Sequence, residues 1–191
     1  MRLFIAVDLS QNILNKIEEI TADFKKHTPP TALKWVETEN LHLTVKFIGE
    51  LQESKLQHLK DLLFQSLCHQ APFEIGVSGL GMYPTKNNPR VIWLGITGEK
   101  PLIQIHKTLD QNLAELGIKP EGRPFSPHLT IARVRKNVDS SAVKSIGKTV
   151  SQFTVEPLGA ISIDQVQLYK SVLTPTGPIY TSLLAVPLNQ V

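Results

Sequence analysis

The sequence predicts an α+β protein made of two similar halves around a shared cleft. Strand-like and helix-like apolar patterns alternate along the chain. The order strand, helix, loop, strand occurs in residues 2–47 and again in residues 90–133. In both halves the last strand carries His-Leu-Thr, at 42–44 and at 128–130. No interior linker or low-complexity segment divides the chain, so we expect one domain over residues 1–191.

The first half is predicted to contain three strands and two helices. Residues 2–9 are rich in β-forming residues, which favours a buried strand. Ser10 can cap the following helix, because its hydroxyl can accept a hydrogen bond from a free backbone N–H group. Residues 33–50 predict a short strand, a polar turn and a longer strand, and residues 53–68 return to helical spacing. The apolar face of the first helix holds Ile13, Leu14, Ile17, Ile20 and Phe24, and the prolines at 29 and 30 end it.

The second half begins with two strands and continues into a helix. Pro101 is suited to a first helical position, an apolar stripe runs to Leu116, and Gly117 is suited to the C-terminal cap. The remaining predicted elements are strands over 73–84, 90–98 and 123–134, a helix near 139–149, and C-terminal strands linked by the loop 174–178.

The composition describes a mildly basic globular protein. The formal net charge of +3 and pI near 9.0 are compatible with an anionic ligand, but too weak to indicate extended duplex binding. Cys68 is the only cysteine, which excludes an intramolecular disulfide and a cysteine zinc cluster. No apolar stretch approaches the ~20 residues needed to cross a bilayer, and the N-terminus lacks a signal-peptide pattern. We therefore expect a cytoplasmic protein without a membrane partner.

The spacing of each His-Leu-Thr motif has a chemical rationale. Side chains at i and i+2 of a strand point to the same face, about 7 Å apart. Each motif thus presents an imidazole together with a hydroxyl. One histidine can be neutral and the other protonated near pH 6.5, which suits paired base and acid catalysis. The residues expected to face the core instead are Leu43, Val45, Phe47, Leu129 and Ile131.

The same residues also admit ordinary structural roles. His-x-Thr is a weak signal by itself, since histidine can be a core residue and threonine is common in strands. The shared leucine and the matching positions in the two halves favour the catalytic interpretation. Neither motif places a carboxylate at metal-ligand spacing, and no Gly-x-Ser-x-Gly motif is present.

Several other polar and aromatic residues have two candidate roles. Lys46 shares the predicted face of His42, where it either contacts a ligand phosphate or is solvated. Phe47, Trp35 and Tyr83 are candidates for stacking on a nucleobase, although core packing is the more common role. The histidines without a matching threonine are predicted to be surface residues: His27, His58, His69 and His106.

Two stretches carry a family resemblance. "ENLHLTVKFIGE" (39–50) and "RPFSPHLTIAR" (123–133) resemble the paired H-x-T motifs of the two-histidine phosphoesterases. They are most similar to those of the bacterial and archaeal RNA 2′,3′-cyclic phosphodiesterases, historically called 2′-5′ RNA ligases. The two ends, "RLFIAVDL" and "LYKSVLTPTGPIY", also resemble that family. The resemblance implies a bilobal fold with pseudo-two-fold symmetry, a mainly antiparallel sheet with packed helices in each lobe, and a cleft holding both motifs.

The resemblance also implies an activity and roles for named residues. The reaction is metal-independent hydrolysis of a terminal RNA 2′,3′-cyclic phosphate to a 2′-phosphomonoester, without a cofactor. By resemblance His128 is the proton acceptor and His42 the proton donor, and Arg133 lies near the phosphate. Thr44 and Thr130 are assigned to phosphate binding. Arg133 would face away from His128 on an ideal strand, so its role requires a twist or a bulge.

Alternative functions remain open from the sequence. The same groups could catalyse formation of a 2′-5′ linkage between RNA halves, or the chain could be a non-catalytic nucleotide- or RNA-binding module. The expected partner is RNA with a 2′,3′-cyclic phosphate end, with tRNA halves and cyclic nucleotides as candidate substrates. We expect the protein to act as a monomer.

Overall fold

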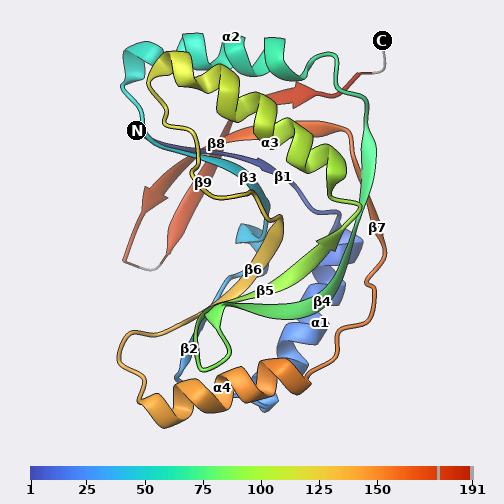
Figure 1. Cartoon of the computed structure of the whole chain (residues 1–191), viewed down its shortest axis with the longest axis vertical. Helices are drawn as coiled ribbons and strands as arrows, with labels where there is room; N and C mark the ends of the chain where they lie inside the picture. Colours follow the sequence, from blue (N-terminus) through green and yellow to red (C-terminus); the bar gives the residue numbers. More distant parts are fainter. Residues whose placement is uncertain (176, 190–191) are drawn as a thin grey trace.

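The computed structural model describes residues 1–175 and 177–189 and has the α+β architecture predicted from the sequence (Figure 1). Its strands are β1 (Arg2–Val7), β2 (Leu33–Trp35), β3 (Leu43–Glu50), β4 (Phe73–Thr85), β5 (Asn88–Thr97), β6 (His128–Val134), β7 (Ala160–Ile163), β8 (Gln165–Leu173) and β9 (Pro178–Pro187). Its α-helices are α1 (Gln11–Lys26), α2 (Leu56–Leu67), α3 (Lys100–Asn112) and α4 (Ser140–Gln152), and its 3₁₀ helices are η1 (Thr38–Asn40), η2 (Glu53–Lys55) and η3 (Leu113–Leu116).

Two antiparallel sheets form the framework of two lobes. Sheet A has the strand order β3-β1-β8-β9, and sheet B has the order β2-β6-β5-β4-β7. Helices α2 and α3 cover sheet A in the upper lobe of Figure 1, and α4 packs against β4 and β5 in the lower lobe. The first motif is thus on an edge strand of sheet A, and the second on a strand next to the edge of sheet B.

Helices α1 and α3, which follow the first strands of the repeated units 2–47 and 90–133, cross to the other lobe. Helix α1 follows β1 of sheet A, but its Phe24 packs edge-on against Trp35 of β2, with ring centroids 5.9 Å apart. Helix α3 follows β5 of sheet B, but it packs against β3 of sheet A. The exchange is visible in Figure 1, where α1 lies beside sheet B and α3 beside sheet A. Each lobe therefore contains a helix from the opposite half.

Each motif strand contains a β-bulge three residues after its histidine. In the β1–β3 ladder Ile5 pairs with Lys46 and Ala6 with Thr44, which leaves Val45 without a partner. In the β5–β6 ladder Ile92 pairs with Ala132 and Trp93 with Thr130, which leaves Ile131 without one. An extra residue reverses the alternation of faces beyond it. The fifth residue after each histidine, Phe47 or Arg133, consequently returns to the face of the histidine.

The bulge in β3 overturns two predictions made from regular alternation. Regular alternation predicts Phe47 in the core, but its side chain is 62% exposed and lies beside Phe4. It predicts Lys46 in contact with an RNA phosphate or solvent, but this side chain is fully buried. The equivalent bulge in β6 supplies the irregularity that Arg133 required. Leu43, Val45, Leu129 and Ile131 are buried as predicted.

Smaller differences concern the ends of elements. Ser10 occupies the N-cap of α1, but its side chain makes no capping hydrogen bond. The helix predicted to Leu116 is α-helical only to Asn112 and continues as η3, with Gly117 in the left-handed conformation as its cap. The strand predicted from residue 123 begins at His128, because prolines at 124 and 127 interrupt it.

Two further observations complete the fold. Residue 176, in the predicted loop 174–178, lies outside the described residues. Within the described ranges no helix combines the length and the apolar content needed to cross a membrane.

Candidate active site

The two motif histidines are held in the same way. Nδ1 of His42 donates a hydrogen bond to the carbonyl of Asn40 at 2.8 Å, and Nδ1 of His128 donates to the carbonyl of Ser126 at 2.8 Å. A carbonyl oxygen can only accept, so Nδ1 carries the hydrogen in both rings. This fixes the tautomer of each neutral imidazole and leaves Nε2 as the nitrogen that can take up or release a proton. Each strand therefore presents one oriented Nε2 atom.

Aromatic rings support both imidazoles. Phe4 of β1 stacks on His42 with ring centroids 4.7 Å apart, and Tyr180 of β9 meets it edge-on at 5.1 Å. On the other lobe Tyr83 of β4 meets His128 edge-on at 5.2 Å, and Trp93 of β5 lies 6.1 Å away. The rings restrict the orientation of each imidazole, which a single hydrogen bond cannot do.

Gly81 makes the position of Trp93 possible. The two residues are paired across β4 and β5, and a Cβ atom at Gly81 would overlap atoms of the Trp93 ring. Only a residue without a side chain leaves the indole room to cross β4. Trp93 in turn contacts Tyr83, with ring centroids 5.1 Å apart. The aromatic support of His128 thus depends on one glycine.

His42 lies in an environment that disfavours its charged form. Burial lowers its pKa below the ordinary value of 6.5, and this effect outweighs the hydrogen bond to Asn40 and the negative charge of Asp8, which both raise it. The Asp8 carboxylate accepts a hydrogen bond from the Tyr169 hydroxyl at 2.7 Å. Burial and this bond raise the pKa of Tyr169 above its ordinary value, so the phenol stays protonated. In the ligand-free protein His42 is therefore mainly neutral at pH 7.

Thr44, Thr130 and Arg133 are placed on the faces that carry the histidines. Thr44 and Thr130 are partly exposed, and within the described part of the chain no hydrogen bond occupies either hydroxyl. The guanidinium of Arg133 is exposed and opposes the burial-driven rise in the pKa of Tyr180. Tyr180 belongs to sheet A and contacts His42, so the charge of Arg133 on sheet B acts on an aromatic residue that packs against the first histidine.

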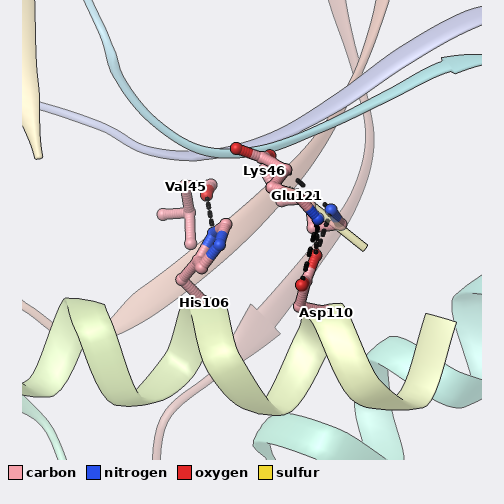
Figure 2. Close-up of polar contacts among 5 residues, drawn as sticks. All are labelled: Val45, Lys46, His106, Asp110 and Glu121. Carbon is pink, nitrogen blue, oxygen red and sulfur yellow. Dashed lines mark hydrogen bonds and ion pairs between the residues drawn. The ribbon is translucent and has the colours of Figure 1, made fainter. Parts of the chain in front are cut away.

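A polar cluster around the buried Lys46 connects the first motif strand to the segment before the second (Figure 2). Nζ of Lys46 donates to Asp110 of α3 at 2.5 Å and lies 3.6 Å from Glu121. The backbone N–H of Glu121 also donates to the Asp110 carboxylate. Burial of Asp110 raises its pKa, but the bonds from Lys46 and Glu121 outweigh this and lower it overall. The carboxylate is therefore ionised and paired.

His106 belongs to the same connection and corrects a prediction. The sequence predicts it on the surface, but it is buried and its Nδ1 donates to the carbonyl of Val45 at 2.8 Å. Its ring stacks on Phe125 at 4.3 Å. Val45 is the extra residue of the β3 bulge, so α3 holds the bulge through His106 and the residue after it through Asp110. The other three predicted surface histidines, at positions 27, 58 and 69, are exposed.

Comparison with known proteins places the chain in a family. A family model described as the 2′-5′ RNA ligase superfamily matches residues 9–171. The chain belongs to the 2′-5′ RNA ligase superfamily. A Methanocaldococcus jannaschii protein named RNA 2′,3′-cyclic phosphodiesterase is 41% identical over 180 residues, covering 94% of this chain and 96% of that protein. A protein of the same name from Methanothermobacter thermautotrophicus is 34% identical over 185 residues and covers 96% of both chains.

Solved structures confirm the two-lobed fold of this superfamily member. The protein TT0787 of Thermus thermophilus superimposes with a TM-score of 0.79 at 27% identity, covering 100% of this chain and 99% of that chain. Escherichia coli LigT in complex with 3′-AMP superimposes with a TM-score of 0.76 at 30% identity, covering 99% and 98%. The family, the fold and its antiparallel sheets are thus as predicted from the paired motifs.

Sequence reasoning missed the residues that support the histidines. Phe4, Tyr169 and Tyr180 reach His42 from three different strands, and no motif in the sequence marks them. Tyr83 was a candidate for base stacking or core packing, and it lies against His128. Trp35 packs on Phe24, as core packing predicts. Across residues 1–175 and 177–189, no group of three or more His, Cys, Asp or Glu side chains is arranged to hold a metal ion.

Proposed function

We propose that this chain hydrolyses the 2′,3′-cyclic phosphate at the end of an RNA strand to a 2′-phosphomonoester. The observation that carries the proposal is the matched pair of histidines, each with Nδ1 bound to a carbonyl and Nε2 left for proton transfer. Their strands, β3 and β6, contact one another although they belong to different sheets. Relatives that cover nearly the whole chain carry the name of this activity.

In this reaction each histidine carries out a different proton transfer. Nε2 of His128 takes a proton from water, and the oxygen attacks the phosphorus of the cyclic phosphate. The bond from phosphorus to the ribose 3′-oxygen breaks, and Nε2–H of His42 gives its proton to that oxygen. The product carries a 2′-phosphate and a 3′-hydroxyl, and the two histidines have exchanged protonation states. Each positioned proton transfer contributes roughly 10²–10⁴ to the rate.

The polar residues beside the histidines hold the charge of the phosphate. The hydroxyls of Thr44 and Thr130 donate to its non-bridging oxygens, where negative charge increases as water attacks. Arg133 supplies a positive charge from the same face as His128, because the bulge at Ile131 turns it there. No metal ion is needed for these steps.

Binding of the anionic substrate favours the protonated form of His42, which acid catalysis requires. The low pKa of the partly buried ring keeps it neutral in the free protein near pH 7. A phosphate monoanion in contact with the ring favours the imidazolium and raises that pKa. His42 is therefore protonated as the anion binds, in the complex where a proton donor is required.

The test is incubation of the purified protein with an oligonucleotide that ends in a 2′,3′-cyclic phosphate, in the presence of EDTA. The expected product has a 2′-phosphate end. A joined product formed with a second RNA bearing a 5′-hydroxyl would instead support 2′-5′ ligation. Binding without conversion would support a non-catalytic module. Loss of hydrolysis in EDTA, restored by a divalent metal, would contradict the metal-independent mechanism.

A further inference from the structure

A basic groove lies at the edge of sheet B, beside the candidate active site. It has a volume of about 520 Å³ and is lined by the segments 29–34 and 133–142, with neither motif histidine in its walls. Four of its lining residues are cationic and exposed, and they are Lys34, Arg133, Arg135 and Lys136. The groove is therefore a strongly charged cavity distinct from the two histidines.

The positive charge of the groove is not neutralised by the protein. Asp139 is the only acidic residue that lines it, and hydrogen bonds from Ser141 and Ala142 occupy one oxygen of its carboxylate, Oδ1, at the N-terminus of α4. Among the residues that the structure describes, none of the four cations forms an ion pair. The four cations and Asp139 together give the groove a formal charge of +3, which equals the formal net charge of the whole chain, +3.

The register of the strands sets two of these cations against each other. Lys34 of β2 is the direct cross-strand partner of Arg133 of β6. Directly opposed like charges destabilise a sheet, because their Cβ atoms are only about 5 Å apart. An anion bound between them would remove this repulsion. Fold stability alone therefore does not account for this pair.

The groove shares Arg133 with the candidate active site. This residue lines the groove and also acts on Tyr180, which contacts His42. Along β6 it lies five residues from His128, a separation of about 16 Å on an extended strand. A terminal nucleotide held at the histidines does not extend through the groove beyond Arg133. A longer RNA strand continues in its 5′ direction from the cyclic phosphate and can extend that far.

We infer that the groove is a second phosphate subsite, which binds internal phosphodiesters of single-stranded RNA upstream of the reacting end. This inference rests on the proposed function, since the histidines set where the 3′ end lies. The protein then prefers oligonucleotides over cyclic mononucleotides. Lys34, Arg135 and Lys136 contribute to binding of the longer substrate and leave the chemical step to the histidines.

The test compares a groove variant with a charge-matched control. Lys34→Gln/Arg135→Gln removes two cations from the groove, and Lys100→Gln/Lys107→Gln removes two exposed cations from α3 in the other lobe. The substrates are 2′,3′-cyclic AMP and an oligoadenylate of about eight nucleotides with a 2′,3′-cyclic phosphate end. The groove variant is expected to raise KM for the oligonucleotide roughly tenfold and to leave kcat/KM for the mononucleotide unchanged. The control should change neither value by a comparable factor.

A binding measurement separates this inference from the proposed activity. A fluorescein-labelled oligoadenylate of the same length with an ordinary 3′-hydroxyl is titrated with protein while its fluorescence anisotropy is followed at several salt concentrations. The slope of log K against log salt should fall by about 0.7 for each phosphate contact removed from a single strand. This outcome supports the groove even if no cyclic phosphate is hydrolysed. Undetectable binding by the wild-type protein would overturn the inference, as would equal affinity and salt dependence of the wild type and the groove variant, or an equal loss on both substrates.

Discussion

At the scale of single residues, the sequence predicted the two motif histidines but not the aromatic side chains that contact them. His42 and His128 share a local pattern, so spacing alone could place each beside a threonine on one strand face. Their aromatic neighbours come from other strands, and contacts between distant strands leave no local pattern. His106 was missed for the same reason. Its partner Val45 lies 61 positions away along the chain, so the buried hydrogen bond cannot be read from sequence spacing.

The low pKa of His42 gives a prediction at this scale. Desolvation shifts the midpoint of its titration below 6.5 in the ligand-free protein, so the ring loses its proton at a lower pH than an exposed histidine. Adding inorganic phosphate should raise the midpoint, because the bound anion stabilises the imidazolium. Titration followed by NMR, with the resonance assigned from its loss in His42→Gln, measures both values. A midpoint at or above 6.5 without phosphate would contradict the proposed environment.

At the scale of elements, the two bulges mark the points beyond which the alternation of apolar residues no longer predicts the strand face of a side chain. The strands of both motifs were predicted, and the faces of their first residues were correct. Phe47 was misassigned because the extra residue in β3 reverses the alternation, and a bulge has no signature in an apolar run. For Arg133 the family resemblance required an irregular strand, and β6 contains one. Local pattern therefore predicted the elements, and tertiary pairing decided their register.

The contact between Gly81 and Trp93 can be tested directly. Gly81→Ala places a methyl group where the indole ring lies, so Trp93 and then Tyr83 must move away from His128. We expect kcat to fall by roughly 10- to 100-fold, since a displacement of about 1 Å can cost that much. Gly122→Ala is the matched control, because a Cβ atom there meets no heavy atom within 4 Å. Similar kcat values in the two variants would show that the Trp93 position does not matter.

The cluster around the buried Lys46 gives a stability prediction. Lys46→Met leaves the partly exposed Asp110 and Glu121 carboxylates without their cation, which should cost about 1–3 kcal/mol of unfolding free energy in urea. Lys46→Met/Asp110→Asn should recover much of this loss. The charges are then removed together, and the amide oxygen can still accept the Glu121 N–H. If Lys46→Met unfolds at the wild-type urea midpoint, the ion pair does not stabilise the connection between α3 and β3.

At the scale of the whole molecule, the exchange of α1 and α3 between the lobes has a thermodynamic consequence. Each sheet buries its apolar face partly against a helix from the other half, so neither lobe contains all of its own core. The repeated order of elements predicted two similar halves, but it could not show that their helices are exchanged. Which sheet a helix covers depends on packing between distant segments.

This exchange predicts that residues 1–191 unfold as a single domain. Differential scanning calorimetry should give one transition whose van't Hoff and calorimetric enthalpies agree, because loss of one lobe exposes the helix that the other requires. Two resolved transitions, or a stable fragment that keeps one sheet after limited proteolysis, would mean that the lobes fold separately.

The central claim is that His42 and His128 act together on one phosphate, and a double-mutant cycle tests it most directly. Initial rates on an oligonucleotide with a 2′,3′-cyclic phosphate end are compared for the wild type, His42→Ala, His128→Ala and the double variant, with exposed His69→Ala as control. Each single variant should lose roughly 10²–10⁴ in kcat, and the double variant should be about as slow as the singles, because either loss disables the shared step. Near-wild-type turnover in both single variants, or losses that multiply in the double variant, would contradict the paired mechanism.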